Sequence, residues 1–261
     1  MYSKLFMRLF LSIGMIGLFS AIAFADEVQI GSGSQTDSNL PSHSYYKYSM
    51  TEQIYTATEI EEAGGGAGTI NSIAYYNGGS TKTRNFSIYL TNTDKESFSG
   101  ASDWVSVTSS NLVFSGNVEM TAGTWTTIVF DNAFSYDGGN LLVVVDDNTG
   151  NDVSGMSCRI YTASSTQSLY YRNDYTNPDP TNPTISGTTT TNKNQIILDI
   201  ETAATSCAKP KNFNAESITA HTATLTWTAG DEGQSNWDVY LTSPCYSLSP
   251  DRLVLSPHQE Q

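Results

Sequence analysis

The sequence is poor in the residues that build metal and redox sites. It has three cysteines and three histidines, namely Cys158, Cys207, Cys245, His43, His221 and His258. No C-x-x-C pair occurs, and no histidine lies at ligand spacing from a cysteine, which argues against zinc and against dithiol chemistry. Because three is odd, at least one thiol stays unpaired or bonds another chain under oxidising conditions, and a Cys207–Cys245 disulfide is an open alternative.

Short catalytic motifs are also missing. There is no Gly-x-Ser-x-Gly elbow, no His-Glu-x-x-His helix and no phosphate-binding glycine loop. Paired carboxylates can make a glycosidase, but the acidic residues cluster in turns, and nothing distinguishes an acid from a nucleophile. We therefore predict that the chain is not an enzyme and has no catalytic or cofactor-binding residues.

Positive charge is scarce. The chain has 12 lysines and arginines against 26 aspartates and glutamates, and its formal net charge is −14. Such a chain repels phosphate backbones, so we expect no nucleic-acid partner. The charge is compatible with divalent cations, with neutral sugars, or with simple solubility outside the cell.

One long apolar run is present, and it stands at the N-terminus. Lys4 and Arg8 precede an apolar stretch from Leu9 to Phe24, and Ala23-Phe24-Ala25 places small residues where a signal peptidase reads. The run is shorter than the roughly 18 to 20 residues that span a bilayer. We predict that 1–25 is a cleavable signal peptide of a secreted or cell-surface protein, with no transmembrane segment after cleavage.

The rest of the first 200 residues is predicted to form short strands separated by turn residues. Phe86, Ile88 and Leu90 fall on one face of a strand, and Leu141–Val145 is apolar throughout, as in a central strand covered on both faces. No amphipathic segment of helical length follows the signal peptide. The predicted strands are Asn71–Tyr76, Phe86–Thr91, Ser110–Ser115, Trp125–Phe130, Leu141–Val145, Ser157–Thr162, Ser168–Arg172 and Gln195–Ile200.

Many short strands without crossover helices predict an all-β fold. We expect an antiparallel, jelly-roll-like β-sandwich over 26–203, and a parallel α/β fold is excluded. The Thr- and Pro-rich stretch 176–194 is interpreted as a long surface loop of this domain, because the strand at Gln195–Ile200 is needed to complete a sheet.

A different pattern begins at Cys207. Its motifs are Cys207–Phe213, Ser217–Thr219, Ala223–Thr228 and Trp237–Tyr240. They resemble the first three strands of a fibronectin type III domain, in the form found in secreted proteins of Bacteroidetes, with Leu225 and Trp227 pointing into the core. A complete module has about 100 residues, so we expect a truncated fibronectin type III fragment at 204–242 and an aberrant, disordered tail at 243–261.

The first domain carries a resemblance of its own. The motifs are Ile30–Gly33, Tyr45–Ser49, Gln53–Ala57, Gly68–Ala74, Trp125–Ile128 and Val145–Gly150. The set is similar to the jelly-roll domain that precedes fibronectin type III modules in many Bacteroidetes surface proteins, and in style to the cleaved adhesin domains of gingipains. The resemblance implies a fold and a surface location, and only loosely a function.

One acidic stretch is the candidate for a bound ion. The predicted calcium ligands are Asp146, Asp147, Asn148 and Asp152. Calcium takes roughly six to eight oxygen ligands in flexible geometry, and sandwich modules of the resembled kind often hold one. The alternative is a turn whose Asp and Asn side chains bond to their own backbone, and the spacing does not match the EF-hand loop code.

Tyrosines form the other conspicuous clusters. They are Tyr45, Tyr46 and Tyr48, then Tyr75 and Tyr76, then Tyr170 and Tyr171. Neighbouring tyrosines on a strand point to opposite faces, so we expect one of each pair in the core and one outward. An outward ring can stack on a sugar, but we favour the alternative, ordinary sandwich packing with the hydroxyl at the edge.

Three functions compete. The first is a surface or secreted adhesion module that recognises a glycan or host protein through the sandwich loops. The second is an accessory region, carbohydrate-binding or spacer, of a truncated multidomain extracellular peptidase or glycosidase. The third is a structural spacer without a ligand.

Overall fold

A computed structural model describes residues 25–202, 210–217, 224–229, 238–239 and 253–254. The chain divides into two compact units, Met1–Ala204 and Thr205–Gln261. Of the predicted signal peptide only Ala25 is described. It begins a strand opposite Glu201, and cleavage after Ala25 would leave the rest of that strand intact. Within the described ranges no helix is long and apolar enough to cross a bilayer.

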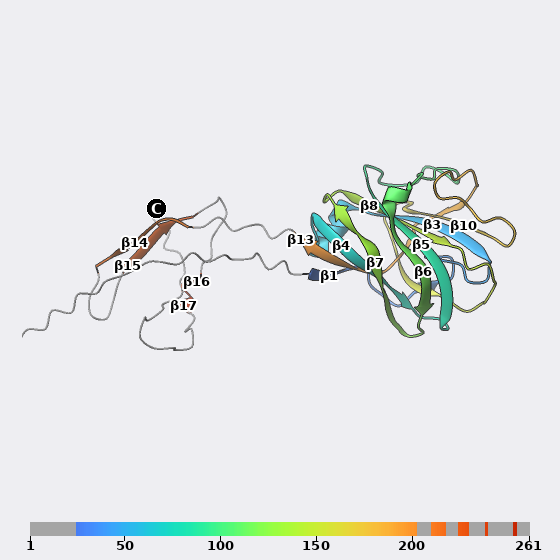
Figure 1. The fold of residues 1–261 in the computed structure, drawn as a ribbon, viewed down its shortest axis with the longest axis horizontal. Helices are drawn as coiled ribbons and strands as arrows, with labels where there is room; N and C mark the ends of the chain where they lie inside the picture. The colour runs from blue at the N-terminus through green and yellow to red at the C-terminus, as the bar shows by residue number, and fades with distance from the viewer. Residues whose placement is uncertain (1–24, 203–209, 218–223, 230–237, 240–252, 255–261) are drawn as a thin grey trace, which may run out of the picture. The chain divides into compact units, whose positions relative to one another are not determined.

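The first unit is a sandwich of two sheets, and every ladder in it is antiparallel (Figure 1). The seven-stranded sheet has the order β1-β13-β4-β9-β12, with β7 beside β4 and β2 beside β9. Its strands are β1 (Ala25–Ile30), β2 (Thr36–Asp37), β4 (Gly68–Asn77), β7 (Thr124–Tyr136), β9 (Cys158–Thr162), β12 (Asn192–Asn194) and β13 (Ile196–Thr202). This confirms the predicted all-β class.

The six-stranded sheet has the order β11-β10-β3-β8-β5-β6. Its strands are β3 (Tyr48–Tyr55), β5 (Lys82–Thr93), β6 (Leu112–Met120), β8 (Asn140–Asp147), β10 (Ser168–Asn173) and β11 (Thr188–Thr190). Each of the eight strands predicted from alternation matches an observed strand, to within a few residues at its ends.

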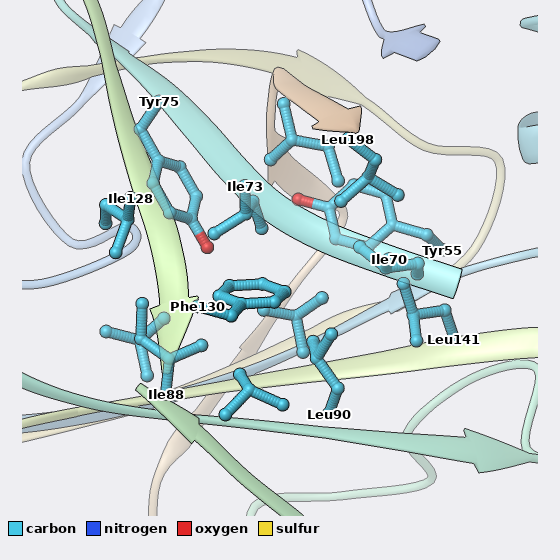
Figure 2. Close-up of a cluster of buried hydrophobic side chains, with 14 of the residues drawn as sticks. Tyr55, Ile70, Ile73, Tyr75, Ile88, Leu90, Ile128, Phe130, Leu141 and Leu198 are labelled. Atoms are coloured by element: carbon cyan, nitrogen blue, oxygen red, sulfur yellow. The ribbon is translucent and has the colours of Figure 1, made fainter. Parts of the chain in front are cut away.

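The main core lies between the two sheets. Ile73 and Tyr75 from β4 face Ile88 and Leu90 from β5, and Leu141 from β8 completes the group (Figure 2). These side chains are all fully buried. Removing such a side chain from water contributes about 1.5–3 kcal/mol, so the alternating strands are held together chiefly by this layer.

A second apolar cluster covers the outer face of the six-stranded sheet. Leu142 and Val144 project to it from β8, whereas Val143 and Val145 project into the main core. The cluster is closed by side chains of the loop after β5, namely Phe98, Trp104, Val105 and Val107. The prediction that Leu141–Val145 is covered on both faces is therefore confirmed.

Two predictions about chain segments need correction. A short helix, α1 (Ala57–Glu62), follows β3, and a 3-10 turn, η1 (Ser109–Asn111), precedes β6. Six residues are too few for a 3.6-residue period to show, but a capping box at Thr56 and Glu59 starts α1. The stretch 176–194 is also not loop throughout. It contains β11 and β12, and Lys193 is fully buried.

The tyrosine prediction holds for one pair. Tyr75 is buried and Tyr76 half-buried, as expected for neighbours on one strand. Tyr45 and Tyr46 instead lie in a turn before β3, and Tyr170 and Tyr171 are both half-buried. The alternation of side chains between the two faces therefore predicted burial correctly only for tyrosines on a strand that has one covered face.

In the second unit, β14 (Lys211–Glu216) pairs with β15 (Thr224–Thr228). Leu225 and Trp227 are less exposed than the threonines between them, and Phe213 stacks on Trp227 with ring centroids 6.5 Å apart. β16 (Asp238–Val239) pairs with β17 (Leu253–Val254), so part of the stretch predicted as a disordered tail is a strand. Cys207, Trp237 and Cys245 lie outside the described residues.

Candidate functional site

Three loops meet at one end of the sandwich. They are 41–47 before β3, 148–157 after β8 and 174–187 after β10. Because β3 runs antiparallel to both β8 and β10, its start lies beside their ends. The Val153 N–H donates to the Ser44 carbonyl at 2.8 Å, and the Gly150 N–H to the Lys47 carbonyl at 3.0 Å. We call this region the tyrosine end.

A buried ion pair lies beneath the tyrosine end. Arg84 Nε, at the start of β5, is 2.7 Å from Asp147 Oδ2, at the end of β8, and both side chains are fully buried. The same guanidinium donates to the Tyr46 carbonyl at 3.0 Å and to the Asn151 carbonyl at 3.2 Å. One side chain therefore holds two of the three loops, which the planar, five-donor fork of arginine permits.

Asp147 is already saturated by protein groups. Its Oδ1 accepts from the Thr149 N–H at 3.0 Å and from the Thr149 hydroxyl, and its Oδ2 accepts from the Ser42 hydroxyl as well as from Arg84. The positive charge opposite this carboxylate is thus a guanidinium. Asp147 therefore fits the alternative to a calcium site, namely a turn in which the Asp side chain accepts from a nearby backbone N–H.

The other predicted calcium ligands lie elsewhere. Asp146 is the neighbour of Asp147 on β8 and projects to the opposite face of the sheet; its Oδ2 accepts from Asn148 Nδ2 at 2.7 Å. Asp152 is exposed in the loop after β8. The four residues therefore do not share one coordination sphere. In the described part of the chain, no group of three or more His, Cys, Asp or Glu side chains is placed to hold a metal.

Asp146 is nevertheless an unusual carboxyl group. It is 4% exposed, and among the described residues its Oδ1 has no hydrogen-bond partner. Burial raises its pKa to about 7, although the hydrogen bond from Asn148 opposes the rise. The group is therefore partly protonated at neutral pH.

Exposed aromatic rings mark the surface of the tyrosine end. Tyr45 is 57% exposed and Tyr175 is 93% exposed, which places two of the few exposed large apolar side chains of the described residues on these loops. The ring of Tyr46 lies 5.6 Å from that of Tyr45 at 82°, and 4.9 Å from that of His43. The Arg172 guanidinium lies 5.3 Å from the Tyr46 ring centre. The rings of His43, Tyr45 and Tyr46 thus form one patch with a cation beside it, and Tyr175 adds an exposed ring on the loop after β10.

His43 is neutral within this patch. Burial lowers its pKa, and the positive charge of Arg172 lowers it further. Its Nδ1 is buried without a hydrogen-bond partner in the described structure. The imidazole therefore acts as an edge-on aromatic neighbour of Tyr46 rather than as a charged group.

The opposite end of the sandwich carries a shallow polar groove. Two adjoining hollows of ≈ 460 Å³ and ≈ 410 Å³ share Glu96 and Asn140. Their walls are mainly polar, with hydroxyl, amide and carboxylate groups; the remaining lining residues are Thr56, Ala57, Thr58, Glu59, Asn92, Thr93, Asp94, Asp137, Gly139, Ser164, Ser165 and Gln167. With no aromatic wall, the groove offers hydrogen bonds but little apolar contact.

A buried lysine lies behind the groove wall. Lys193 Nζ is 2.6 Å from Glu59 Oε2 and donates to Gln167 Oε1 at 2.8 Å and to the Ile54 carbonyl at 2.7 Å. Burial lowers the pKa of Lys193 to about 8, and Glu59 opposes that change. Because acceptors surround all three ammonium hydrogens, Lys193 serves to tie strands together and is poorly placed as a nucleophile.

Sequence reasoning missed both buried cations. Arg84 is two residues before Phe86 and four before Ile88, so its side chain is expected on the same inward face of the strand. A charged residue at a core position could therefore have been recognised from the sequence. Lys193 carried no such signal, because the polar stretch around it was interpreted as a loop.

Comparisons with known proteins do not extend the argument from geometry. No protein-family model, no curated protein and no solved structure matches this chain.

Proposed function

We propose that this protein is a non-catalytic, secreted or cell-surface binding module that recognises a glycan or an extracellular host protein through the loops of the tyrosine end. The observation that carries the proposal is a pair of exposed rings. Tyr45 lies on a loop that Arg84 holds from below, and Tyr175 lies on a loop joined to the first where the Lys47 N–H donates to Asp174 Oδ1 at 3.2 Å. The predicted signal peptide at 1–25 and the resemblance to Bacteroidetes surface proteins support an exported location.

The anchoring makes these loops suitable for recognition. Ordering a free loop on binding costs conformational entropy, and a loop that is already held avoids that cost. Here the buried Arg84 guanidinium fixes the backbone at Tyr46 and Asn151 before any ligand arrives. Tyrosine supplies a large contact face with few rotatable bonds, and its hydroxyl can bond to a polar ligand.

A binding survey tests the proposal. The intact protein is applied to a glycan array and to immobilised extracellular matrix proteins, together with the double variant Tyr45→Ala/Tyr175→Ala. We expect saturable binding of the wild type and a loss of about tenfold or more in the variant, as for aromatic hot spots. Val129→Ala is the control, because Val129 is an exposed apolar residue on β7 and outside these loops.

Two outcomes would overturn the proposal. One is the absence of saturable binding to every surface tested. The other is binding that the double variant retains in full, since recognition would then lie elsewhere on the molecule.

A further inference from the structure

A second aromatic group stands on the outer face of the seven-stranded sheet. Tyr76 on β4 pairs directly with Trp125 on β7, so the two side chains share a face. Tyr75 is buried in the core, which directs Tyr76 outward. On β9, Cys158 and Ile160 are buried, so Arg159 also projects outward.

These three side chains are in contact. The Arg159 guanidinium carbon lies 3.5 Å from the Tyr76 ring centre, and the Trp125 ring meets the Tyr76 ring edge-on at 5.7 Å and 82°. The Tyr76 hydroxyl donates to the Gly123 carbonyl at 2.8 Å, which fixes the ring. The result is a rigid platform, and all three members are half-buried.

The charge on this platform has no counter-ion. Among the described residues, the Arg159 guanidinium makes no ion pair and no side-chain hydrogen bond, whereas the Arg84 guanidinium is fully engaged with Asp147. Arg172 also makes no ion pair among the described residues, but it donates to Asn39 Oδ1, so Arg159 is the described arginine with neither a carboxylate nor a side-chain acceptor. Its planar fork matches a carboxylate in bidentate geometry, and the ring beneath it holds the fork in place.

We propose that Arg159, Tyr76 and Trp125 form a binding site for a carboxylate-bearing sugar, such as a uronic acid. The guanidinium, held on the Tyr76 ring, takes the carboxylate, and the Trp125 ring packs against the apolar face of the pyranose. This site is separate from the tyrosine end and does not depend on the function proposed for it.

A sugar fits this position better than an acidic peptide. Extended peptides usually bind by adding a strand to a free sheet edge. β4 pairs with β13 and β9 on one side and with β7 on the other, and β9 pairs with β2, β4 and β12. β7 has no second partner among the described strands, but β4 lies between β7 and β9, so a strand added at the free edge of β7 would not reach Arg159. A ligand here is held by side chains alone, and one carboxylate on one ring matches one guanidinium beside an aromatic pair.

The acidic surface limits the ligand to few charges. At physiological salt, charges more than about 8 Å apart are largely screened, so a short acidic oligosaccharide meets mainly Arg159. A long polyanion would meet the repulsion of the remaining carboxylates. We therefore choose trigalacturonate as the probe.

Calorimetric titration of the intact protein provides the test. Trigalacturonate is compared with its methyl ester, which keeps the rings and removes the charge. We expect the ester to bind at least about tenfold more weakly, and Arg159→Gln to weaken trigalacturonate binding by a similar factor. Trp125→Ala should weaken the acid and the ester alike. Circular dichroism confirms that each variant folds.

Lys95→Gln is the matched control, since it also removes one positive charge, but from the half-exposed Lys95–Asp103 pair, which lies outside both the platform and the tyrosine end. It should leave trigalacturonate binding unchanged. The proposal is overturned if the wild type does not bind trigalacturonate, if acid and ester bind equally, or if Arg159→Gln has no effect. It is also overturned if an oligoglutamate peptide binds as tightly as the sugar through Arg159. None of these results bears on the Tyr45/Tyr175 variants.

Discussion

The two ends of the sandwich each bury one cation, and they do so differently. At the tyrosine end, Arg84 and Asp147 are both fully buried, and the guanidinium reaches loop carbonyls as well. At the groove end, Lys193 is fully buried but Glu59 keeps 23% of its side chain exposed. Arg84 and Asp147 belong to the six-stranded sheet, whereas Lys193 lies on β12 of the seven-stranded sheet and donates to the Ile54 carbonyl at the end of β3.

The two ion pairs differ in how much stability is lost when one partner is removed. A fully buried pair has no water to replace a lost partner, so each member depends on the other. A pair with one hydrated member loses less when it is broken. The tyrosine end therefore holds the ion pair that depends most on its own partner, and the groove end holds the pair whose partner water can partly replace.

Breaking the Arg84–Asp147 pair should have the largest effect. Arg84→Met leaves the Asp147 carboxylate buried without its cation, and we expect a loss of about 3–5 kcal/mol in the free energy of unfolding. Urea unfolding measures it. The double variant Arg84→Met/Asp147→Leu should lose less than Arg84→Met alone, because no charge is left unpaired. Equal losses would show that the unpaired Asp147 carboxylate is not the source of the loss.

The unpaired buried carboxyls should make stability depend on pH. Burial raises the pKa of Glu52 to about 8, against the hydrogen bonds from the Val105 N–H. Between its ordinary pKa of 4.5 and about 8, folded Glu52 holds a proton that the unfolded chain releases. Stability from this group is therefore full below pH 4.5 and falls as the pH rises toward 8.

Melting curves between pH 5 and 9 test this dependence. The wild type should lose several degrees in Tm over that range, since one pKa unit corresponds to about 1.4 kcal/mol. Glu52→Gln keeps an acceptor for the Val105 N–H and should flatten the profile. An unchanged slope in Glu52→Gln would assign the dependence to other groups, of which Asp146 is the first to examine.

Lys193→Met should cost less than Arg84→Met. The variant frees Glu59 to take up water, and we expect a loss of about 2 kcal/mol, mainly from the unpaired Gln167 and Ile54 oxygens. The control is Lys95→Met, which breaks the half-exposed Lys95–Asp103 pair and should cost about 1 kcal/mol or less. A Lys193→Met loss as large as that of Arg84→Met would contradict the proposed difference between the ends.

Calcium should have the smallest effect. Asp147 is saturated by Arg84, Ser42 and Thr149, and Asp146 points to the other face. Adding millimolar calcium, or removing it with a chelator, should leave Tm unchanged. A tightly bound ion would instead stabilise by about 2.7 kcal/mol at a hundred times its Kd, and a rise in Tm that Asp152→Asn abolishes would restore the predicted site.

The sequence predicted most of the strands in which apolar and polar residues alternate, but not β1, in which Val28 and Ile30 are buried and Glu27 and Gln29 are exposed. β3 was missed because both of its faces are buried and both mix polar with apolar residues. Thr51 and Gln53 project toward the main core side, while Met50, Glu52 and Ile54 face the outer cluster, so hydropathy does not alternate. The candidate site was missed for a different reason. Asp147 was identified as a ligand, but its partner Arg84 is 63 residues away in the chain.

Local chemistry alone determined the all-β class, most strand positions, the acidic surface and the unit that ends near residue 204. Those properties follow from the period of apolar side chains and from turn residues, which act over a few positions. Tertiary structure decided which charges are buried together and which rings face solvent. Such contacts join strands distant in the chain, and their energies depend on burial and on partner geometry, which no short stretch of sequence contains.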